Sequence, residues 1–471
     1  MIIFIYIFSD YIIIMETNSN IDLIMDNPRK AINRLAFPTI FSMILMFLNN
    51  IIDSFWVSGL NTDSLAALGF ISPLYLVIIG IGIGIGAGAS SLISRYLGAK
   101  RIDDANNAVI HTLIIMIIVS IIILIIGIFF LDDLVILLGA SRVSSYCLNY
   151  GQIIFLLNIV FLLPNVVGSI FRTEGDAKRA TTPLIVASII NLIIDPILIY
   201  GLNLKIFGAG LATVIASLVG CLLLLYWIYI KKDTYFNYNF SEYQRKLEIY
   251  KEIIVVSLPS ATEEIVFALV AIILNYLIIT TSGVDEIASF TIAWRIIAIA
   301  FLPGVSIGIA SITVSGIAWG ARNWKNFNET IKYSTLLCLS ITLLISAFFF
   351  IFAHPLCELF NFQTGNLTLI NRSSEILKLL VFYNFLIAFG VIPTYIYQGV
   401  GLGFKSLALT ILRELVLSMG FAYLFGIAFN WGVFGVYLGA IVGMNIGSLI
   451  AFISMIRFNR KFKKEIMTIN D

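Results

Sequence analysis

Residues 107–131 read NAVIHTLIIMIIVSIIILIIGIFFL and contain no Asp, Glu, Lys or Arg. A run of this length can cross the hydrocarbon layer of a bilayer as one helix, which takes about 20 apolar residues. Similar runs recur along the 471 residues, each ended by Gly, Pro, Asn or charged residues. The whole chain is 60% hydrophobic and 12% charged, whereas soluble proteins carry about 25% charged residues. The sequence therefore predicts an all-α polytopic membrane protein.

The apolar runs predict twelve transmembrane helices. We expect them near residues 35–58, 66–92, 107–131, 149–171, 183–202, 207–230, 253–281, 287–313, 331–354, 376–400, 407–429 and 433–456. Prolines in or at the start of these helices predict bends, because proline removes a backbone donor. They are Pro38, Pro183, Pro196, Pro303 and Pro393.

The basic residues predict the orientation of these helices. An even number of spans puts both chain ends on one side of the membrane, and most of the 29 Lys and Arg residues then fall on that side. The residues that fall on the opposite side are Arg142, Lys205, Arg372 and Lys378. Because Lys and Arg concentrate in cytoplasmic loops, we expect a cell-membrane protein with both termini in the cytoplasm.

The two halves of the chain share a glycine pattern. Gly82-x-Gly84-x-Gly86 precedes Gly98-Ala99-Lys100, and Gly304-x-Ser306-x-Gly308 precedes Gly320-Ala321-Arg322 at the equivalent place in the second half. Glycine-rich stretches also occur in membrane helices simply because they permit close packing. Two such matches at equivalent spans favour an internal repeat of six helices, related by an axis along the membrane normal.

This repeat defines the predicted domains. We expect an N-lobe over 25–230 and a C-lobe over 251–456, joined by a polar cytoplasmic linker over 231–250 and followed by a basic tail over 457–471. The N-terminal extension 1–24 lacks the basic n-region of a signal peptide. Translation could begin at Met1, Met15 or Met25, and we leave this segment out of the fold.

Polar residues inside spans are costly and therefore mark candidate sites. Asn49 and Asp53 are four residues apart and share one helix face, as do Asn191 and Asp195. Thr213 in the next span can present a hydroxyl to the same cavity. Such a cluster can hold Na⁺ with oxygen ligands, or it can take up and release a proton.

Simpler readings exist for both carboxylates. Asp53 can lie at the outer end of its span and meet water, and Asp195 can bond to a backbone group freed beside Pro196.

Further polar residues lie on other predicted spans. Candidate members of a substrate cavity are Asn49, Asn50, Asn165, Glu263, Glu264 and Arg295. The two glutamates also fit a solvated helix start, and Arg295 fits either a snorkelling residue or an ion-pair partner. His111 and His354 fall near span ends and are expected at the membrane interface.

Several function classes lack their signatures. No GxxxxGK[ST] motif is present, and Cys147, Cys221, Cys338 and Cys357 with two histidines form no zinc pattern. The net charge of +2 does not favour nucleic acid. Two other readings stay open: a flippase for lipid-linked precursors, which needs a basic central cavity, and a membrane-embedded transferase, which needs a metal-binding acidic cluster at one face.

Short motifs carry a resemblance to a known family. They read DSFWVSGL (53–60), LAALG (65–69, with Pro73 after it), SRYLGAK (94–100), RTEGDAK (172–178), NLIIDP (191–196) and QGVGLG (398–403). From about Pro28 to Arg457 the chain resembles multidrug and toxic compound extrusion (MATE) transporters. The likeness implies two six-helix lobes around a central cavity in a protein that is no enzyme, works as a monomer and needs no cofactor. It also implies export of organic, cationic amphipathic compounds by alternating access, in exchange for H⁺ or Na⁺.

The resemblance also assigns roles to individual positions. Asp53 and Asp195 match the N-lobe cation site of prokaryotic members, Asn191 and Thr213 match neighbouring positions, and the set is a possible Na⁺ site. Pro38 matches a first-helix proline linked to bending. Glu263 or Glu264 could match a seventh-helix acid, whereas the tenth span lacks the aspartate found in some members.

Overall fold

The computed structural model describes residues 24–360 and 367–470, and these residues are almost entirely helical. The first half contains α3 (Pro28–Ser58), α4 (Thr62–Gly98), α5 (Ile102–Phe129), α6 (Leu131–Leu137), α7 (Ser144–Leu156), α8 (Ile159–Thr173), α9 (Ala177–Pro196) and α10 (Lys205–Leu225). The second half contains α11 (Leu247–Ser282), α12 (Val284–Ala298), α13 (Leu302–Gly320), α14 (Trp324–Ile351), α15 (Ala353–Phe360), α16 (Leu367–Leu380), α17 (Ile387–Gly399), α18 (Gly403–Thr410), α19 (Gly420–Tyr423) and α20 (Gly432–Asn470). The N-terminal extension predicted over residues 1–24 lies, except for Ile24, outside the described residues.

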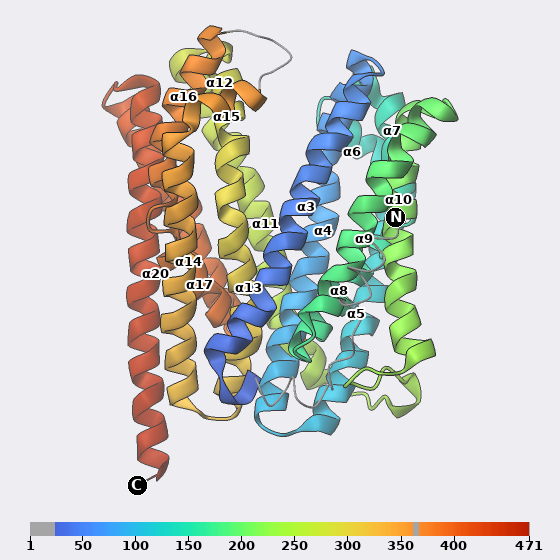
Figure 1. Cartoon of the computed structure of the whole chain (residues 1–471), viewed down its shortest axis with the longest axis vertical. Helices are drawn as coiled ribbons and strands as arrows, with labels where there is room; N and C mark the ends of the chain where they lie inside the picture. The colour runs from blue at the N-terminus through green and yellow to red at the C-terminus, as the bar shows by residue number, and fades with distance from the viewer. Residues whose placement is uncertain (1–23, 361–366, 471) are drawn as a thin grey trace.

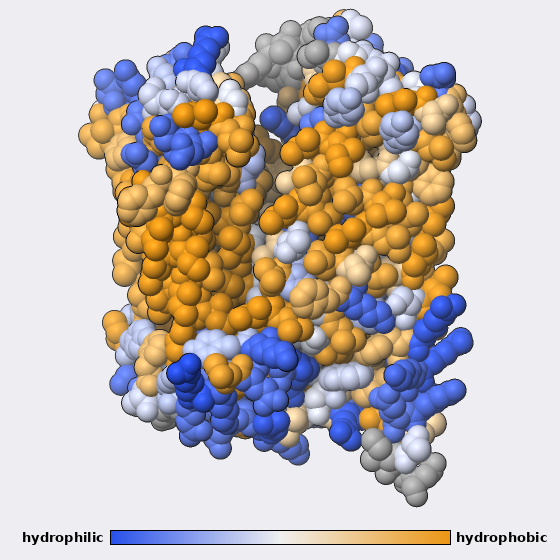
Figure 2. Space-filling view, turned by 180° about the vertical axis from the view of Figure 1, so that it is seen from behind, coloured by the Kyte–Doolittle hydropathy of each residue, from blue (hydrophilic) through white to orange (hydrophobic). Residues whose placement is uncertain are grey.

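These helices form the predicted membrane-spanning set. Within the described residues, ten helical segments are long and apolar enough to cross a bilayer alone, and two bent pairs bring the number to twelve. Figure 2 shows a broad hydrophobic band between hydrophilic ends. On α5, for example, Ile118, Ile122 and Ile125 are about half exposed, as lipid-facing residues are. The chain is therefore a multi-pass membrane protein.

Two lobes follow the two halves of the sequence. In Figure 1 the N-lobe helices α4–α10 and the C-lobe helices α12–α20 approach each other at the lower end and diverge toward the upper end. Helix α3 packs on α9 of the N-lobe and on α13 of the C-lobe, and α11 packs on α4. The two lobes are thus joined along their centre and at one end.

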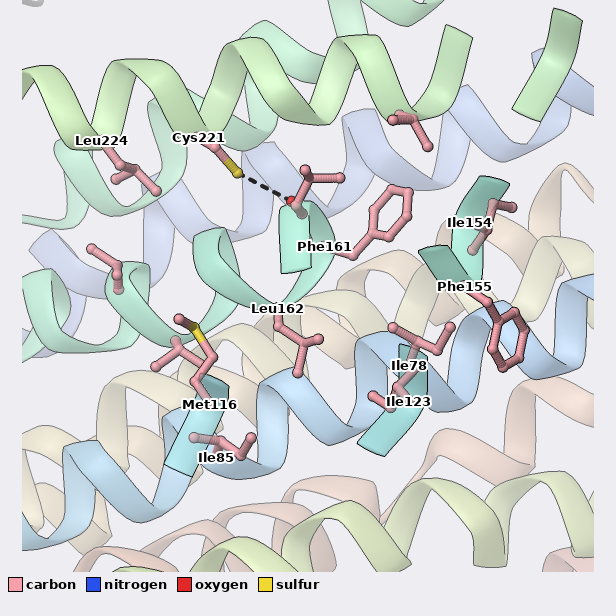
Figure 3. Packing of buried hydrophobic residues seen from close by; sticks show 14 of the residues in the cluster. Ile78, Ile85, Met116, Ile123, Ile154, Phe155, Phe161, Leu162, Cys221 and Leu224 are labelled. Atoms are coloured by element: carbon pink, nitrogen blue, oxygen red, sulfur yellow. Dashed lines mark hydrogen bonds between the residues drawn. The ribbon is translucent and has the colours of Figure 1, made fainter. Parts of the chain in front are cut away.

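The N-lobe core is a close-packed layer of side chains. Figure 3 shows Ile78, Ile85, Met116 and Leu162 meeting where α4, α5 and α8 pack together. Because lipid is as apolar as these side chains, close packing rather than exclusion from water stabilises such a bundle. All four cysteines are buried free thiols, and Cys221 donates to a backbone carbonyl oxygen at 3.3 Å. They act as small, largely apolar residues in the core.

The two bent pairs lie at equivalent places in the two lobes. Helices α7 and α8 meet at 45°, and the segment Leu367–Asn384 meets α17 at 48°. Amide side chains bond to backbone groups near each break: Asn158 donates to Ser120 O at 3.0 Å, and Asn445 accepts from Leu386 N at 3.0 Å. This correspondence is what a six-helix repeat predicts.

Proline positions explain other features of the spans. The eighth predicted span is interrupted as expected: α12 ends at Ala298, and α13 begins at Leu302 with Pro303 in its first turn. Proline is tolerated there, because the first backbone N–H groups of a helix have no partner inside it. Pro38, by contrast, lies inside an unbroken α3. At the end of the chain, α20 continues as a helix through the basic segment to Asn470.

The lobes make direct backbone contact at the lower end of Figure 1. A Cβ atom added to Gly98 would collide with the carbonyl oxygen of Ile317 on α13, and one added to Gly320 would collide with that of Arg95 on α4. The repeat-related glycines thus let α4 and α13 touch. Ser91 on α4 also donates a hydrogen bond to the backbone oxygen of Gln398 on α17. The two lobes are therefore in contact at this end of the molecule.

The segment between the lobes is packed on the N-lobe. Phe236 and Tyr238 are buried, and Phe236 N donates to Glu174 at 3.3 Å. His111, which we expected at the membrane interface, is instead fully buried. Its Nε2 accepts from Lys246 N at 3.2 Å, and its Nδ1 lies 2.8 Å from Asn107 O. One ring nitrogen thus bonds to the linker and the other to its own helix, so His111 holds the linker against α5. His354 is exposed, and its Nε2 lies 3.2 Å from Asn371 Oδ1.

Candidate cation site and central cavity

Four polar side chains predicted to face a cavity meet between α3 and α9. Asn191 donates to Asp195 Oδ1 at 3.0 Å, one turn further along α9. Asn49 on α3 donates a hydrogen bond to Asn191 Oδ1 and lies 3.4 Å from both oxygens of Asp53. The i, i+4 spacing of each pair places its two members on one helix face, and helix packing turns the two faces toward each other.

The two carboxyl groups lie against each other. Asp53 and Asp195 are close enough to share a hydrogen bond when one of them carries a proton. Asp195 is 1% exposed, and among the described residues its Oδ2 atom has no hydrogen-bond partner. Two adjacent anions repel each other in a medium of low dielectric constant, and a proton or a cation between them would relieve this repulsion.

The contacts of the two aspartates bear on their simpler readings. Asp195 accepts from a side-chain amide, and within the described residues no hydrogen bond joins it to a backbone group beside Pro196. Asp53 is half-buried and lines a partly open cavity of about 90 Å³ together with Asn49 and Asn191. Its carboxylate therefore faces this cavity near the end of its helix.

The small cavity beside Asp53 holds further oxygen atoms. Thr213 lines it, and its hydroxyl donates to Ala209 O at 3.0 Å, which leaves the oxygen lone pairs free to act as ligands. Tyr75 and Tyr150 line the same cavity and were missed in the sequence. Aromatic residues of membrane proteins are so often interfacial or core residues that no local pattern singles these two out.

A larger cavity lies between the lobes. It has a volume of about 450 Å³ and is lined by residues of both halves, including Asn50, Asn165, Glu263 and Glu264. Asn49 lines the small cavity instead, and Asn50 lines both. The rest of the wall is largely apolar. It includes the residues Met43, Met46, Phe47, Phe267, Trp294 and Phe301.

The adjacent glutamates of α11 have different surroundings. Glu263 is 9% exposed and accepts hydrogen bonds from Ser406 at 2.7 Å and from Gln398 at 3.3 Å. A solvated helix start is therefore wrong for Glu263. Glu264 is exposed on the cavity wall.

Charged residues of the C-lobe form a second polar region. Arg295 is exposed and lines a cavity of about 250 Å³ together with Glu414. Arg413 and Glu414 form an ion pair at 2.8 Å, with side chains only 3% and 1% exposed. Neither residue is among those predicted from the sequence, although two adjacent charges inside an apolar run indicate a polar site within a span.

A protein family model and known proteins are similar to this chain over most of its length. The MatE family model matches residues 38–197 and 259–424, which together make up more than half of the chain. Multidrug export protein MepA of Staphylococcus aureus is 22% identical over 427 residues, which cover 90% of this chain and 92% of that protein.

Solved structures agree as well. A MATE structure in complex with MaL6 matches with a TM-score of 0.92 at 32% identity and covers 94% of this chain and 99% of its own. The outward-facing conformation of a multidrug resistance MATE family transporter matches with a TM-score of 0.91 at 32% identity over the same shares. The chain belongs to the MatE family of multidrug and toxic compound extrusion transporters, and it is therefore a membrane transporter and not an enzyme.

Proposed function

We propose that this protein is a secondary active multidrug exporter, which expels organic cationic amphipathic compounds in exchange for H⁺ or Na⁺. The observation that carries the proposal is the Asp53–Asp195 pair, which lies in the N-lobe beside the cavity between the lobes. A cation bound at this pair neutralises buried negative charge, which makes the pair responsive to an ion gradient.

The composition of the central cavity supports this substrate class. Methionine and aromatic side chains adapt to ligands of different shape, and aromatic faces attract organic cations. Met43, Phe47 and Trp294 supply such surfaces, and the exposed carboxylate of Glu264 supplies negative charge. The name of the staphylococcal relative, a multidrug export protein, points the same way.

The proposed cycle couples the two cavities through α3. With the lobes apart at the upper end, where Figure 2 shows a hollow between them, H⁺ or Na⁺ binds at Asp53, Asp195 and Asn191, with Thr213 as a further ligand for Na⁺. Because α3 contributes Asp53 and Asn49 to the cation site and Met43 and Phe47 to the central cavity, repacking at the site lowers substrate affinity. Pro38 lies on the same helix and is the place where we expect it to bend.

The proposal places the protein in the cell membrane as a monomer with both termini in the cytoplasm. By the bounds of the helices, most basic residues fall at the end of the molecule where α20 ends in Figure 1, which supports this orientation. The contact of α4 with α13 at Gly98 and Gly320 then faces the cytoplasm, and the hollow at the upper end of Figure 2 faces outward.

The test is transport by the purified protein in liposomes. We expect a fluorescent cationic dye to move when a pH or a sodium gradient is imposed, and the gradient that works identifies the ion. Asp195→Asn is expected to abolish this movement, whereas the matched control Asp63→Asn removes an exposed carboxylate at the start of α4 and leaves it intact. Wild-type transport by folded Asp195→Asn would refute the role of the pair. No transport under either gradient by the folded wild type would refute the exporter and favour a flippase for lipid-linked precursors.

A further inference from the structure

A groove with both apolar and basic walls lies outside the transport pathway. It has a volume of about 820 Å³ and lies between α20 and the turn that joins α17 to α18. Figure 2 shows the hydrophilic end of α20 at the lower right, directly below the hydrophobic band. The groove therefore spans the boundary between the lipid-facing belt and the basic end of the molecule.

One face of α20 forms the long wall of this groove. Ile450, Ile453, Arg457 and Lys461 recur every three or four residues, so their side chains lie on one helix face. Ile450 and Ile453 are 38% and 48% exposed and lie on the membrane side. Arg457 and Lys461 follow one and two turns later. This wall therefore changes from apolar to basic along the helix.

A third basic residue is held in place on the opposite wall. Lys405 is half-buried, with its Nζ 4.2 Å from the centre of the Tyr397 ring and 5.3 Å from that of Phe458. Tyr397 is itself anchored, since its hydroxyl lies 2.9 Å from the Ser454 hydroxyl of α20. These contacts fix the position of the ammonium group but do not neutralise its charge.

The positive charge in the groove is largely uncompensated. Within residues 24–360 and 367–470, neither Lys405 nor Arg457 forms an ion pair with a carboxylate. Lys461 makes only a long contact of 3.9 Å to Glu465, and both of these side chains are exposed. Three basic groups thus face one acidic group at the height of the lipid headgroups.

We propose that this groove binds an anionic phospholipid from the cytoplasmic leaflet. The phosphate would lie among Lys405, Arg457 and Lys461, and an acyl chain would follow Ile453 and Ile450 into the hydrophobic band. Basic pockets between membrane helices on the cytoplasmic side are suited to such headgroups. A soluble phosphate shares the charge of the headgroup but gains nothing from the apolar half of the groove, so the occupant we commit to is the lipid.

The test counts lipids bound to the purified full-length protein by native mass spectrometry. Phosphatidylglycerol is compared with phosphatidylcholine of the same acyl chains, each with and without inorganic phosphate. The test variant Arg457→Gln/Lys461→Gln removes two groove charges. The matched control Arg460→Gln/Lys463→Gln removes two charges from the same segment of α20 that do not line the groove.

We expect the wild type and the control to retain phosphatidylglycerol in preference to phosphatidylcholine, even with excess inorganic phosphate. At roughly 1 kcal/mol for each basic residue near an anionic lipid surface, the test variant is expected to lose phosphatidylglycerol affinity by a factor on the order of 30. Equal losses in the test and control variants would show diffuse surface attraction and overturn the proposal. Equal binding of the two lipids, or displacement of phosphatidylglycerol by inorganic phosphate, would overturn it as well.

Discussion

Asn49 on α3 donates a hydrogen bond to the side-chain oxygen of Asn191 on α9, which joins residues 142 positions apart in the chain. Asn191 in turn donates to Asp195 at 3.0 Å, and Asn49 also lies 3.4 Å from Asp53. The two amides therefore bond to each other and to the two carboxyl groups, and they hold α3 and α9 in register. A change in the charge of either aspartate acts on both helices.

Asn191→Leu should destabilise the protein by roughly 1–3 kcal/mol, because it removes the amide that donates to the buried Asp195 and the oxygen that accepts from Asn49. The measurement is denaturant or thermal unfolding of the purified protein. Asn50→Leu is the control, since the Asn50 amide is exposed and donates to Met46 O in its own helix. Equal stability of Asn191→Leu and the wild type would contradict the bridging role.

Gly98→Ala is expected to weaken the contact between α4 and α13, because the added Cβ meets the carbonyl oxygen of Ile317. Overpacking of this kind costs about 1–3 kcal/mol. Spin labels placed on α4 and α13 at this end would report a longer distance. Gly69→Ala, also on α4, is the matched control, because nothing lies within 4 Å of its Cβ position. An unchanged distance distribution in Gly98→Ala would mean that the contact does not hold the lobes closed.

Glu174 predicts a pH dependence of stability. Burial beneath the linker raises the pKa of its carboxyl group from 4.5 to about 8, although the backbone N–H of Phe236 partly opposes this shift. The folded protein therefore keeps a proton that the unfolded chain releases. The free energy of unfolding should fall as pH rises from about 4.5 to about 8, by at most ~1.4 kcal/mol per pH unit.

The check on Glu174 is a series of unfolding measurements across this pH range. Glu174→Gln cannot ionise, so we expect its stability to depend less on pH than that of the wild type. Glu248→Gln, an exposed position in the first turn of α11, is the control and should keep the wild-type slope. Identical slopes for Glu174→Gln and the wild type would rule out Glu174 as the source.

The buried Arg413–Glu414 pair predicts a strongly non-additive effect. Arg413→Met alone leaves a buried carboxylate unpaired and should cost about 3–5 kcal/mol, whereas Arg413→Met/Glu414→Leu should cost much less. Unfolding of the two single variants and the double variant measures the coupling. Arg142→Ala, which breaks an exposed pair with Asp63, is expected to change stability by less than about 1 kcal/mol. Additive losses at Arg413 and Glu414 would contradict the pairing.

The spans and the aspartate site could be predicted from the sequence because they depend on local signals. Apolar runs identify spanning helices in lipid whatever their neighbours. Asp53 and Asp195 stand out because charge inside such runs is costly. The two aspartates are 142 residues apart, and helix geometry alone does not predict that they lie together. That expectation rested on the resemblance to MATE transporters and on the repeated Asn–x₃–Asp spacing.

Other features depend on tertiary packing and left weaker signals. The break between α7 and α8 lies at Leu157–Asn158, several residues before Pro164, so proline alone does not locate it. His111 is a polar residue near the end of a predicted span, where interface residues are common. It is buried because the linker passes over it, with Lys246 N bonded to its ring. Tyr75 and Tyr150 likewise become part of the cation site only once α4, α7 and α9 are assembled.

The most direct test of the central claim measures the exchanged cation itself. Purified protein is loaded with H⁺ or ²²Na⁺, and release of the ion is followed as a cationic dye binds. We expect dye binding to release one of these ions from the wild type and from Asp63→Asn, but not from Asp53→Asn or Asp195→Asn. Release that persists in folded Asp53→Asn/Asp195→Asn protein would contradict the claim that this pair carries the coupling ion.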